Sequence, residues 1–423
     1  MTNLPDGWKL STIGECAEII RGVTYSKSET LSANDEDAIP LLRATNLEVD
    51  SIDFKDMVYV PKRLVKPQQI LKLNDIFLAA SSGSISVVGK SAQVIKTNGE
   101  TFGAFCVVIR PKNINPKFLS YLVQSPEIRD HWSAKVKGTN INNLKPSDIS
   151  ETKIPIPPLP EQHKIVEILE DHLSSLDATL ADVKRVKVKA AQFRRSLLQA
   201  AFTGNLGSDG VRLMTELPDW WQTKKVGELA DTQLGKMLNK GKQSGKFAKP
   251  YLRTDNVHWG SFDLSEIKEM DIFPEEEEKY LAKKGDLLMC EGGASGRTAI
   301  WTQDYSISFQ NHVHRIRPKN IEEITPKYLL YYFEWFIKNG FASDLIKGVT
   351  ISSLSQSGLR SIDVVYPPFP EQHKIVEILE DHLSRLDASV ALADAMEKQS
   401  AGLRRSLLQA AFTGQLSKEV ASV

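Results

Sequence analysis

The sequence predicts an α+β protein in which two tandem domains of mixed helix and strand are each followed by a long helix. Two sets of observations support this fold. The first is an internal repeat, because Glu161–Ser174 (EQHKIVEILEDHLS) returns as Glu371–Ser384, and Arg194–Gly204 (RRSLLQAAFTG) returns as Arg404–Gly414. The second is that short β-rich runs and turn residues fill the sequence before each copy. Both matches lie 210 residues apart, which is too long for a solenoid unit and typical of a duplicated domain plus helix.

Each copy of the repeat predicts one long helix. Pro160 and Pro370 stand in the first turn, where a missing N–H costs nothing, and Gly204 is a C-terminal stop signal. Apolar residues recur at a spacing of 3.5 along the first copy, with Leu169, Leu176, Val183, Ala190 and Leu197 at position a, and Val166, Leu173, Leu180, Lys187, Arg194 and Ala201 at position d. The second copy has Leu379, Leu386, Ala393, Ser400 and Leu407 at position a, and Val376, Leu383, Val390, Glu397, Arg404 and Ala411 at position d.

A seam of this length predicts a partner helix, since a helix of roughly 60 Å is too long to bury against one small domain. The simplest partner is the other copy, and Gly402 with its polar neighbours marks a looser part of the seam. The alternative, two unrelated surface helices, would leave both apolar stripes exposed.

Composition indicates an ordinary globular protein. The chain has 423 residues, of which 41% are hydrophobic and 25% charged, with 53 basic and 53 acidic residues. No apolar run approaches the roughly 18 residues that a transmembrane helix needs, and the first ten residues do not resemble a signal peptide. Three scattered cysteines, Cys16, Cys106 and Cys290, favour a reducing cytoplasm over a disulfide framework. We therefore expect a cytoplasmic protein with no membrane contact.

The repeat extends through both domains. LPDGWKLSTIGECAE near the N-terminus matches LPDWWQTKKVGELAD at Leu217–Asp231, and PLLRATN at Pro40–Asn46 matches PYLRTDN at Pro250–Asn256. These matches predict a first domain at 1–155, a first long helix at 156–205, a second domain at 206–366, a second long helix at 367–416 and a tail at 417–423.

Secondary structure inside each domain is predicted only coarsely. We expect strands at Phe105–Ile109, Val87–Val88 and Thr298–Trp301, between turns rich in Gly, Ser and Asn. Helices are expected at Pro116–Val123 and Pro326–Trp335, each with a proline in its first turn.

One loop differs strongly between the domains. Gly235–Pro250 carries five lysines and no acidic residue, which is typical of a mobile loop that contacts phosphate groups. The alternative is a solvated surface loop without a ligand. The acidic run Glu275–Glu278 is expected to face solvent and would repel DNA if it lay nearby.

No segment of the sequence matches a complete catalytic motif. Tyr366–Phe369 (YPPF) lacks the polar first side chain with which amino-methyltransferases accept a hydrogen bond from the target amine. Gly241–Lys246 has the wrong spacing for a phosphate-binding loop, and His312 and His314 have no further ligand at zinc spacing. We therefore expect no enzyme activity in this chain.

The complete pattern resembles the specificity subunit of a Type I restriction–modification enzyme. The resemblance rests on motifs that each occur twice: the helix start IPPLPEQHKIVEIL or YPPFPEQHKIVEIL, an Arg-x-x-Asn segment, and a Lys-Gly-x-x-Ile-x-x-Leu segment. It implies two target recognition domains similar to that of adenine-N6 methyltransferases, joined by two antiparallel helices with an approximate two-fold axis.

The same resemblance implies the partners. Each domain would read one half of a bipartite site on double-stranded DNA, and the helix pair would set the gap. Two modification subunits that use S-adenosylmethionine would dock beside the helices, and restriction subunits that use ATP and Mg²⁺ for translocation would join them. The chain itself would hold no cofactor and no metal.

Polar and basic side chains on loops are the candidate DNA contacts, because cations hold phosphates while Arg, Lys, Asn and Thr read base edges. Positions shared by both domains are expected to hold phosphates or the fold, and the unshared loops to read sequence. The candidates are Lys27, Arg43, Asn46, Lys90, Lys137, Thr139, Asn140, Lys236, Lys240, Lys242, Lys246, Arg253, Asn256, Arg297, Lys347 and Thr350.

Two other function classes fit parts of the pattern. A protein-binding assembly scaffold without DNA readout would share the neutral charge and the helix seams, but would show no salt-dependent binding to duplex DNA. An enzyme with an unrecognised site, such as a nuclease, would show activity of the purified chain with magnesium.

Overall fold

The chain folds into two compact units, each of which combines one domain with parts of both long helices. The computed structural model describes residues 4–48, 50–136, 142–207, 210–211, 217–239, 241, 243–292, 295–347 and 353–416. The first unit comprises 1–183 with 394–423, and the second comprises 184–393. The predicted tail at 417–423 lies outside the described residues.

Two sheets form the domain of the first unit. An antiparallel four-stranded sheet has the order β2 (Ala17–Arg21), β9 (Cys106–Pro111), β5 (Ile76–Ala79), β7 (Ser91–Gln93). A three-stranded sheet has the order β4 (Val58–Pro61), β3 (Ala38–Leu42), β8 (Thr101–Phe102), with β3 and β8 parallel. Since alternate residues of a strand face opposite sides, Ile76 and Leu78 of β5 pack with the helices, while Phe77 and Ala79 pack with residues of the smaller sheet.

Helices and short pairings complete this domain. The helices are α1 (Ile13–Cys16), α2 (Pro116–Gln124), α3 (Pro126–Lys135) and α4 (Pro146–Ser150). The strands β1 (Lys9–Thr12) and β11 (Lys153–Ile156) pair antiparallel, as do β6 (Ser81–Ser82) and β10 (Asn142–Asn143). The helix predicted at 116–123 is confirmed, whereas α3 was not predicted. The strand predicted at Val87–Val88 is wrong, because these residues lie in a turn that leads to β7.

The second unit repeats the strand order of the main sheet and adds a strand to the smaller sheet. Its main sheet has the order β15 (Ala230–Leu234), β24 (Val313–Pro318), β21 (Leu287–Cys290), β22 (Thr298–Ile300). Its smaller sheet has the order β19 (Lys268–Asp271), β16 (Ala248–Leu252), β23 (Ile307–Phe309), β20 (Leu281–Ala282). The helices are α6 (Val226–Leu229), α7 (Glu277–Tyr280), α8 (Pro326–Lys338) and α9 (Gln356–Ser361).

Short antiparallel pairs accompany these elements. They are β14 (Gln222–Lys225) with β27 (Asp363–Tyr366), β17 (Val257–His258) with β18 (Ser261–Phe262), β25 (Ile346–Lys347) with β26 (Ser353–Leu354), and β12 (Leu206–Gly207) with β13 (Gly210–Val211). The helix and strand predicted at 326–335 and 298–301 correspond to α8 and β22.

Both long helices exist as predicted. They are α5 (Leu159–Phe202) and α10 (Phe369–Phe412), and each is followed by a glycine with positive φ, Gly204 at 75° and Gly414 at 76°. A side chain disfavours that conformation, so glycine there ends the helix. Among the predicted a and d positions, only Glu397 is exposed, which confirms the seam.

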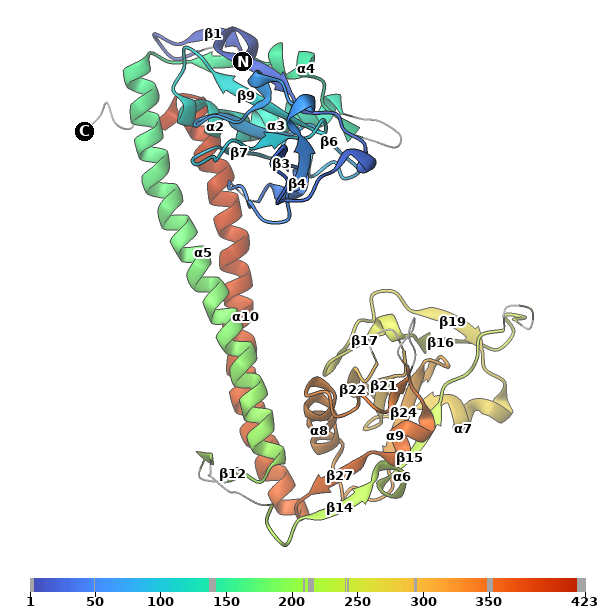
Figure 1. Ribbon diagram of the computed structural model, residues 1–423. Coiled ribbons are helices and arrows are strands. Elements are labelled where there is room, and N and C mark those ends of the chain that lie inside the picture. The colour runs from blue at the N-terminus through green and yellow to red at the C-terminus, as the bar shows by residue number, and fades with distance from the viewer. Residues whose placement is uncertain are drawn as a thin grey trace. The chain divides into compact units, whose positions relative to one another are not determined.

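Pairing of the two helices is antiparallel in each unit. In the first unit the start of α5 packs on the end of α10, and in the second unit the end of α5 packs on the start of α10 (Figure 1). Arg404 Nη1 lies 3.4 Å from Asp177 Oδ1, and Arg194 Nη1 lies 3.2 Å from Asp387 Oδ1. These ion pairs occupy equivalent positions of the repeat, so both units pair their helices in the same register.

A buried glutamine explains the repeated Pro-Glu-Gln at each helix start. Gln372 is fully buried; its Nε2 donates to the carbonyls of Glu323 and Pro367, and its Oε1 accepts from Thr325 N. Gln162 makes the equivalent bonds to Pro157 O and from Asn115 N in the first unit. The motif therefore fastens each long helix to the helix that follows the main sheet.

The preceding glutamate of the motif also has a partner in each unit. Trp8 Nε1 donates to Glu161 at 2.9 Å, and Trp220 Nε1 donates to Glu371 at 3.0 Å. These bonds join the first residues of each domain to its helix start.

Candidate DNA-recognition surface

A one-turn helix after β3 and β16 carries the repeated Arg-x-x-Asn segment. In both units the Asn side chain is 3% exposed and closes the turn. Asn46 Oδ1 accepts from Arg43 N at 2.8 Å, while its Nδ2 donates to the carbonyls of Asp53 and Lys55. Asn256 makes the same set of bonds to Arg253, Asp263 and Glu266.

This arrangement argues against the prediction that Asn46 and Asn256 contact DNA. Both amides are buried and their polar atoms are already hydrogen-bonded within the domain, so breaking those bonds would cost stability. The repeated asparagine holds the turn, and the arginine before it is the residue that reaches the surface.

The two arginines are half-buried at the rim of this turn. Arg43 Nη2 donates to Asp56 O at 2.9 Å, and its Nε is buried without a hydrogen-bond partner among the described residues. Arg253 Nη1 lies 3.2 Å from Asp255 Oδ2, and Arg253 Nη2 lies 3.9 Å from Glu266 Oε1. Both carboxylates are exposed. Exposed ion pairs of this kind contribute little stability and exchange readily for another anion.

A groove of about 760 Å³ lies beside Arg43 in the first unit. Loop 23–31, the turn at 43–45, strand β4 and residues 103–106 line it, and Lys27 is exposed on that loop. Its lining mixes aromatic side chains with hydroxyls: Tyr25, Tyr59, Phe105, Thr24, Thr30 and Thr45. Phe105 is 66% exposed, which is unusual for a large apolar side chain.

Sequence reasoning did not single out these aromatic and hydroxyl residues. They come from segments as far apart as Thr24 and Phe105, and no spacing in the chain brings them together. The only available signal was that the 21–37 loop is not shared between the two domains.

In the second unit, residues 244–247 of the equivalent loop are hydrogen-bonded to a strand of the smaller sheet. Asp271 of β19 accepts from Ser244 Oγ at 2.9 Å and from the backbone N–H of Gly245 and Phe247 at 3.0 Å. Burial raises the pKa of Asp271, but these donors outweigh it and the net pKa is lowered. These bonds hold the backbone on both sides of Lys246, whose side chain is exposed.

Lys236 and Arg297 are engaged inside the domain. Lys236 Nζ donates to Asp271 O at 2.8 Å, pairs with Glu276, and lies 4.7 Å from the Phe273 ring centre. Arg297 Nη2 donates to Thr254 O at 2.9 Å. Both side chains support loops from within, so the structure argues against direct DNA contact by either.

The acidic run at 275–278 is also partly internal. Glu276 and Glu277 are half-buried and pair with Lys236 and Lys249. The hydrogen bond from Lys236 is the largest cause that lowers the pKa of Glu276. The expectation that the whole run faces solvent is therefore wrong, since two of its carboxylates neutralise lysines of the loop.

The remaining candidates divide into two groups. Lys90 is half-buried at the edge of β7 in the first unit. Lys347 lies in β25, and nothing further is described of its side chain. The other candidates lie outside the described residues, namely Lys137, Thr139, Asn140, Lys240, Lys242 and Thr350.

The two histidines considered as zinc ligands have structural partners. His314 is fully buried, one ring nitrogen lies 2.9 Å from Leu354 O, and burial lowers its pKa. His312 Nδ1 lies 3.2 Å from Glu291. The part of the chain that the structure describes contains no group of three potential metal ligands. Nor does any described helix have the length and hydropathy to cross a membrane.

Comparison with known proteins identifies the relatives of both domains. Residues 5–185 and 218–392 match the family model of the Type I restriction modification DNA specificity domain. The chain is 30% identical to the Type I restriction enzyme StySPI specificity subunit of Salmonella potsdam, over 98% of this chain and 90% of that protein. It is 31% identical to the EcoKI specificity subunit of Escherichia coli (strain K12), with the same coverage.

Solved structures share the fold. One chain from a study of complex assembly and conformational transition of the type I R-M system superimposes with a TM-score of 0.70 at 18% identity, covering 97% of this chain and 99% of that one. The HsdS subunit from Thermoanaerobacter tengcongensis gives a TM-score of 0.51 at 19% identity, with 97% and 98% coverage.

Proposed function

Because this chain belongs to the family of Type I restriction–modification DNA specificity subunits, we propose that each of its two domains reads one half of a bipartite DNA site. The chain is a sequence-specific DNA-recognition subunit, and the catalytic activities of such systems lie in other subunits. Residues 1–155 and 206–366 are the two target recognition domains of this proposal.

The groove beside Arg43 is the observation that carries the proposal for the first domain. It combines Arg43, whose Nε has no hydrogen-bond partner within the described chain, with an exposed Lys27, the hydroxyls of three threonines and an exposed aromatic ring. Arginine reads guanine edges in the major groove, hydroxyls hydrogen-bond to bases or phosphates, and apolar side chains contact the thymine methyl group. These are the side chains that base readout requires.

The equivalent surface of the second domain is built around Arg253 and Lys246. Asp271 fixes the backbone of 243–247, so Lys246 is presented from a defined loop rather than a flexible one. A rigid loop supports specificity, because less conformational entropy is lost on binding. Lys90, Lys137, Thr139, Asn140, Lys240, Lys242, Lys347 and Thr350 remain proposed contacts, and Asn46, Asn256, Lys236 and Arg297 are left out.

The helices are proposed to fix the distance between the two half-sites. Each runs without a break for 44 residues, and the same antiparallel register is used in each unit. Two readers on one DNA face must be spaced by about one helical turn, roughly 34 Å, and a rigid helix pair holds such a spacing where a flexible linker would not.

The complex is proposed to contain two methyltransferase subunits and the restriction subunits. S-adenosylmethionine, ATP and Mg²⁺ would be bound by those partners and not by this chain. Because its substrate is chromosomal and invading DNA, we place the complex in the cytoplasm.

Exchange of one loop tests the proposal. Replacing 243–247 by another sequence that keeps Ser244 and Gly245, and therefore the Asp271 bonds, should alter only one half of the methylated sequence. The matched control replaces 24–31 in the first domain and should alter only the other half. Sequencing of methylated adenines in a host carrying each variant reads the outcome, and a change in both halves from either exchange contradicts the assignment of one half-site to each domain.

A further inference from the structure

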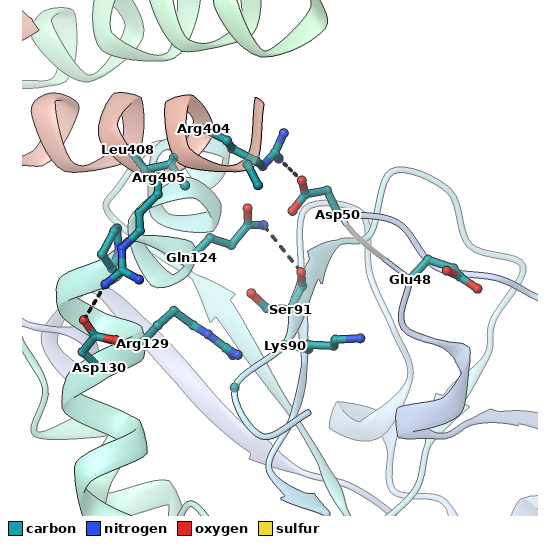
Figure 2. Close-up of a pocket in the computed structure, with 13 residues that line it drawn as sticks. Glu48, Asp50, Lys90, Ser91, Gln124, Arg129, Asp130, Arg404, Arg405 and Leu408 are labelled. Atoms are coloured by element: carbon teal, nitrogen blue, oxygen red, sulfur yellow. Dashed lines mark hydrogen bonds and ion pairs between the residues drawn. The ribbon is translucent and has the colours of Figure 1, made fainter. Parts of the chain in front are cut away.

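A second cavity of about 370 Å³ lies in the first unit, away from the groove beside Arg43. Helices α2 and α3, the start of β7 and the last part of α10 line this open cavity (Figure 2). Its charged lining residues are Lys90, Arg129, Arg404, Arg405, Glu48, Asp50 and Asp130, while Ala401, Leu408 and Pro126 contribute apolar surface. This volume suits a small ligand that carries one charged group.

Two of the four cations are already neutralised by aspartates. Arg404 pairs with Asp50 and lies 3.4 Å from Asp177, and Arg405 lies 3.0 Å from Asp130. Lys90 and Arg129 make no ion pair with any residue that the structure describes. Two positive charges, on Lys90 and Arg129, and one negative charge, on Glu48, therefore remain without an ion-pair partner among the described residues, so the lining carries a net positive charge.

Unpartnered donors point at the same space. Arg129 Nη1 is buried without a hydrogen-bond partner among the described residues, and Nη2 has only a long contact of 3.5 Å to Ser86 O. Ser91 is only 5% exposed, and its Oγ also has no hydrogen-bond partner among the described residues. Figure 2 shows Ser91 Oγ directed toward the side of the cavity where Arg129 lies. Orphaned buried donors cost stability, which a bound acceptor would recover.

Burial lowers the pKa of the Arg129 guanidinium, and the neighbouring Asp130 offsets this effect only partly. The guanidinium also lies against Gly89, whose φ of +79° and missing side chain make room for it, because a Cβ there would come within 2.5 Å of Nη1. The backbone at Gly89 thus leaves room for the Arg129 guanidinium.

In the second unit, the equivalent position carries a carboxylate that forms ion pairs. Glu334 of α8 is the repeat equivalent of Gln124 in α2, and it is 3% exposed. Its carboxylate accepts from Arg194 Nε at 2.7 Å and Nη2 at 2.9 Å, and from Lys338 at 2.6 Å. In the first unit Gln124 replaces this carboxylate and makes only a 3.5 Å contact to Ser91 O. The repeat equivalent of Arg194 is Arg404, which Asp50 neutralises in the first unit, so the carboxylate that pairs with this arginine comes from α8 in one unit and from the loop at Asp50 in the other.

We propose that the cavity lined by α2, α3 and α10 binds a phosphate group, held by Arg129 and Ser91, with Lys90 adding positive charge to the lining. Arginine matches a phosphate with parallel N–H donors, lysine supplies charge, and a serine hydroxyl donates one further bond. The phosphate has two possible sources, a free phosphorylated small molecule or the backbone of bound DNA.

Gln124→Glu is the decisive variant, because it restores in the first unit the carboxylate that the second unit already accommodates. The purified full chain is titrated with inorganic phosphate at low ionic strength and binding is followed by calorimetry. We expect Gln124→Glu to weaken phosphate binding at least tenfold without lowering the melting temperature, and Arg129→Gln to weaken it by a similar factor. Gln409→Glu, which adds the same charge on an exposed position of α10 outside the cavity, should bind as the unaltered chain does.

A short duplex distinguishes the two sources. If the phosphate belongs to DNA, the duplex displaces inorganic phosphate, and Gln124→Glu reduces the salt dependence of duplex binding by about one phosphate contact. If it belongs to a small molecule, duplex and phosphate bind independently. Absence of phosphate binding by the unaltered chain, or equal binding by Gln124→Glu, overturns the proposal.

Discussion

Removal of the buried amide of Gln372 should loosen the second domain from its helix by a predictable amount. Truncation to alanine leaves Thr325 N and Pro367 O buried without partners, and Glu323 O only partly exposed to water. At about 1–1.5 kcal/mol for each buried group, the expected loss is about 3 kcal/mol. Gln162 makes one bond fewer and one of its partners is only partly buried, so its truncation should cost about 2 kcal/mol.

Hydrogen exchange resolves the two effects within one chain. A loss of about 3 kcal/mol corresponds to roughly 100-fold faster exchange of the most protected amides. We expect this change in α8 for Gln372→Ala, and a smaller one in α2 for Gln162→Ala. Gln409→Ala, at an exposed position of α10, is the control and should change neither.

Two results would refute this reasoning. One is an equal response of α2 and α8 to Gln372→Ala, which would mean that the amide stabilises the chain generally rather than the helix start. The other is a change below about tenfold in α8, which would mean that water replaces the lost bonds at little cost.

Two further predictions concern the helices. Burial raises the pKa of Glu334, but the bonds from Arg194 and Lys338 outweigh burial and leave the pKa below the ordinary 4.5. The stabilisation by this carboxylate is therefore complete above pH 4.5 and is lost as the pH falls through the lowered pKa. Glu334→Gln should therefore flatten the acid limb of the stability curve measured by chemical denaturation, and an unchanged limb would show that this carboxylate does not govern it. Insertion of four residues within 181–190, with four more in the equivalent 391–400, should add about 6 Å to the helix pair and lengthen the unread gap by about two base pairs. Methylated-site sequencing measures the gap, and an unaltered length would remove the helices as its determinant.

The helix register was predictable because it depends on spacing alone. A side chain at every seventh residue returns to the same face of a helix whatever surrounds it, so Leu169 and Leu379 could be assigned to the seam and are fully buried. The stops at Gly204 and Gly414 were equally local, since positive φ favours glycine in any context.

The roles of polar residues were not predictable in the same way. Asn46 and Lys236 carry groups that suit DNA, and only the surrounding fold shows that their hydrogen bonds are already made. The groove beside Arg43 was missed for the converse reason, because its threonines and aromatic rings are ordinary residues until the strands bring them together.

By itself, the sequence determined the duplication, the two long helices with their buried seam, and the family to which the chain belongs. These features are written in residue order, as periodicity and as repeated motifs. Only the tertiary structure decided which cations are neutralised by a nearby carboxylate. Gln124 and Glu334 occupy equivalent positions of the repeat, but Gln124 lines an open cavity, whereas Glu334 forms ion pairs with Arg194 and Lys338. Charge compensation depends on distances in space, and residue order does not contain them.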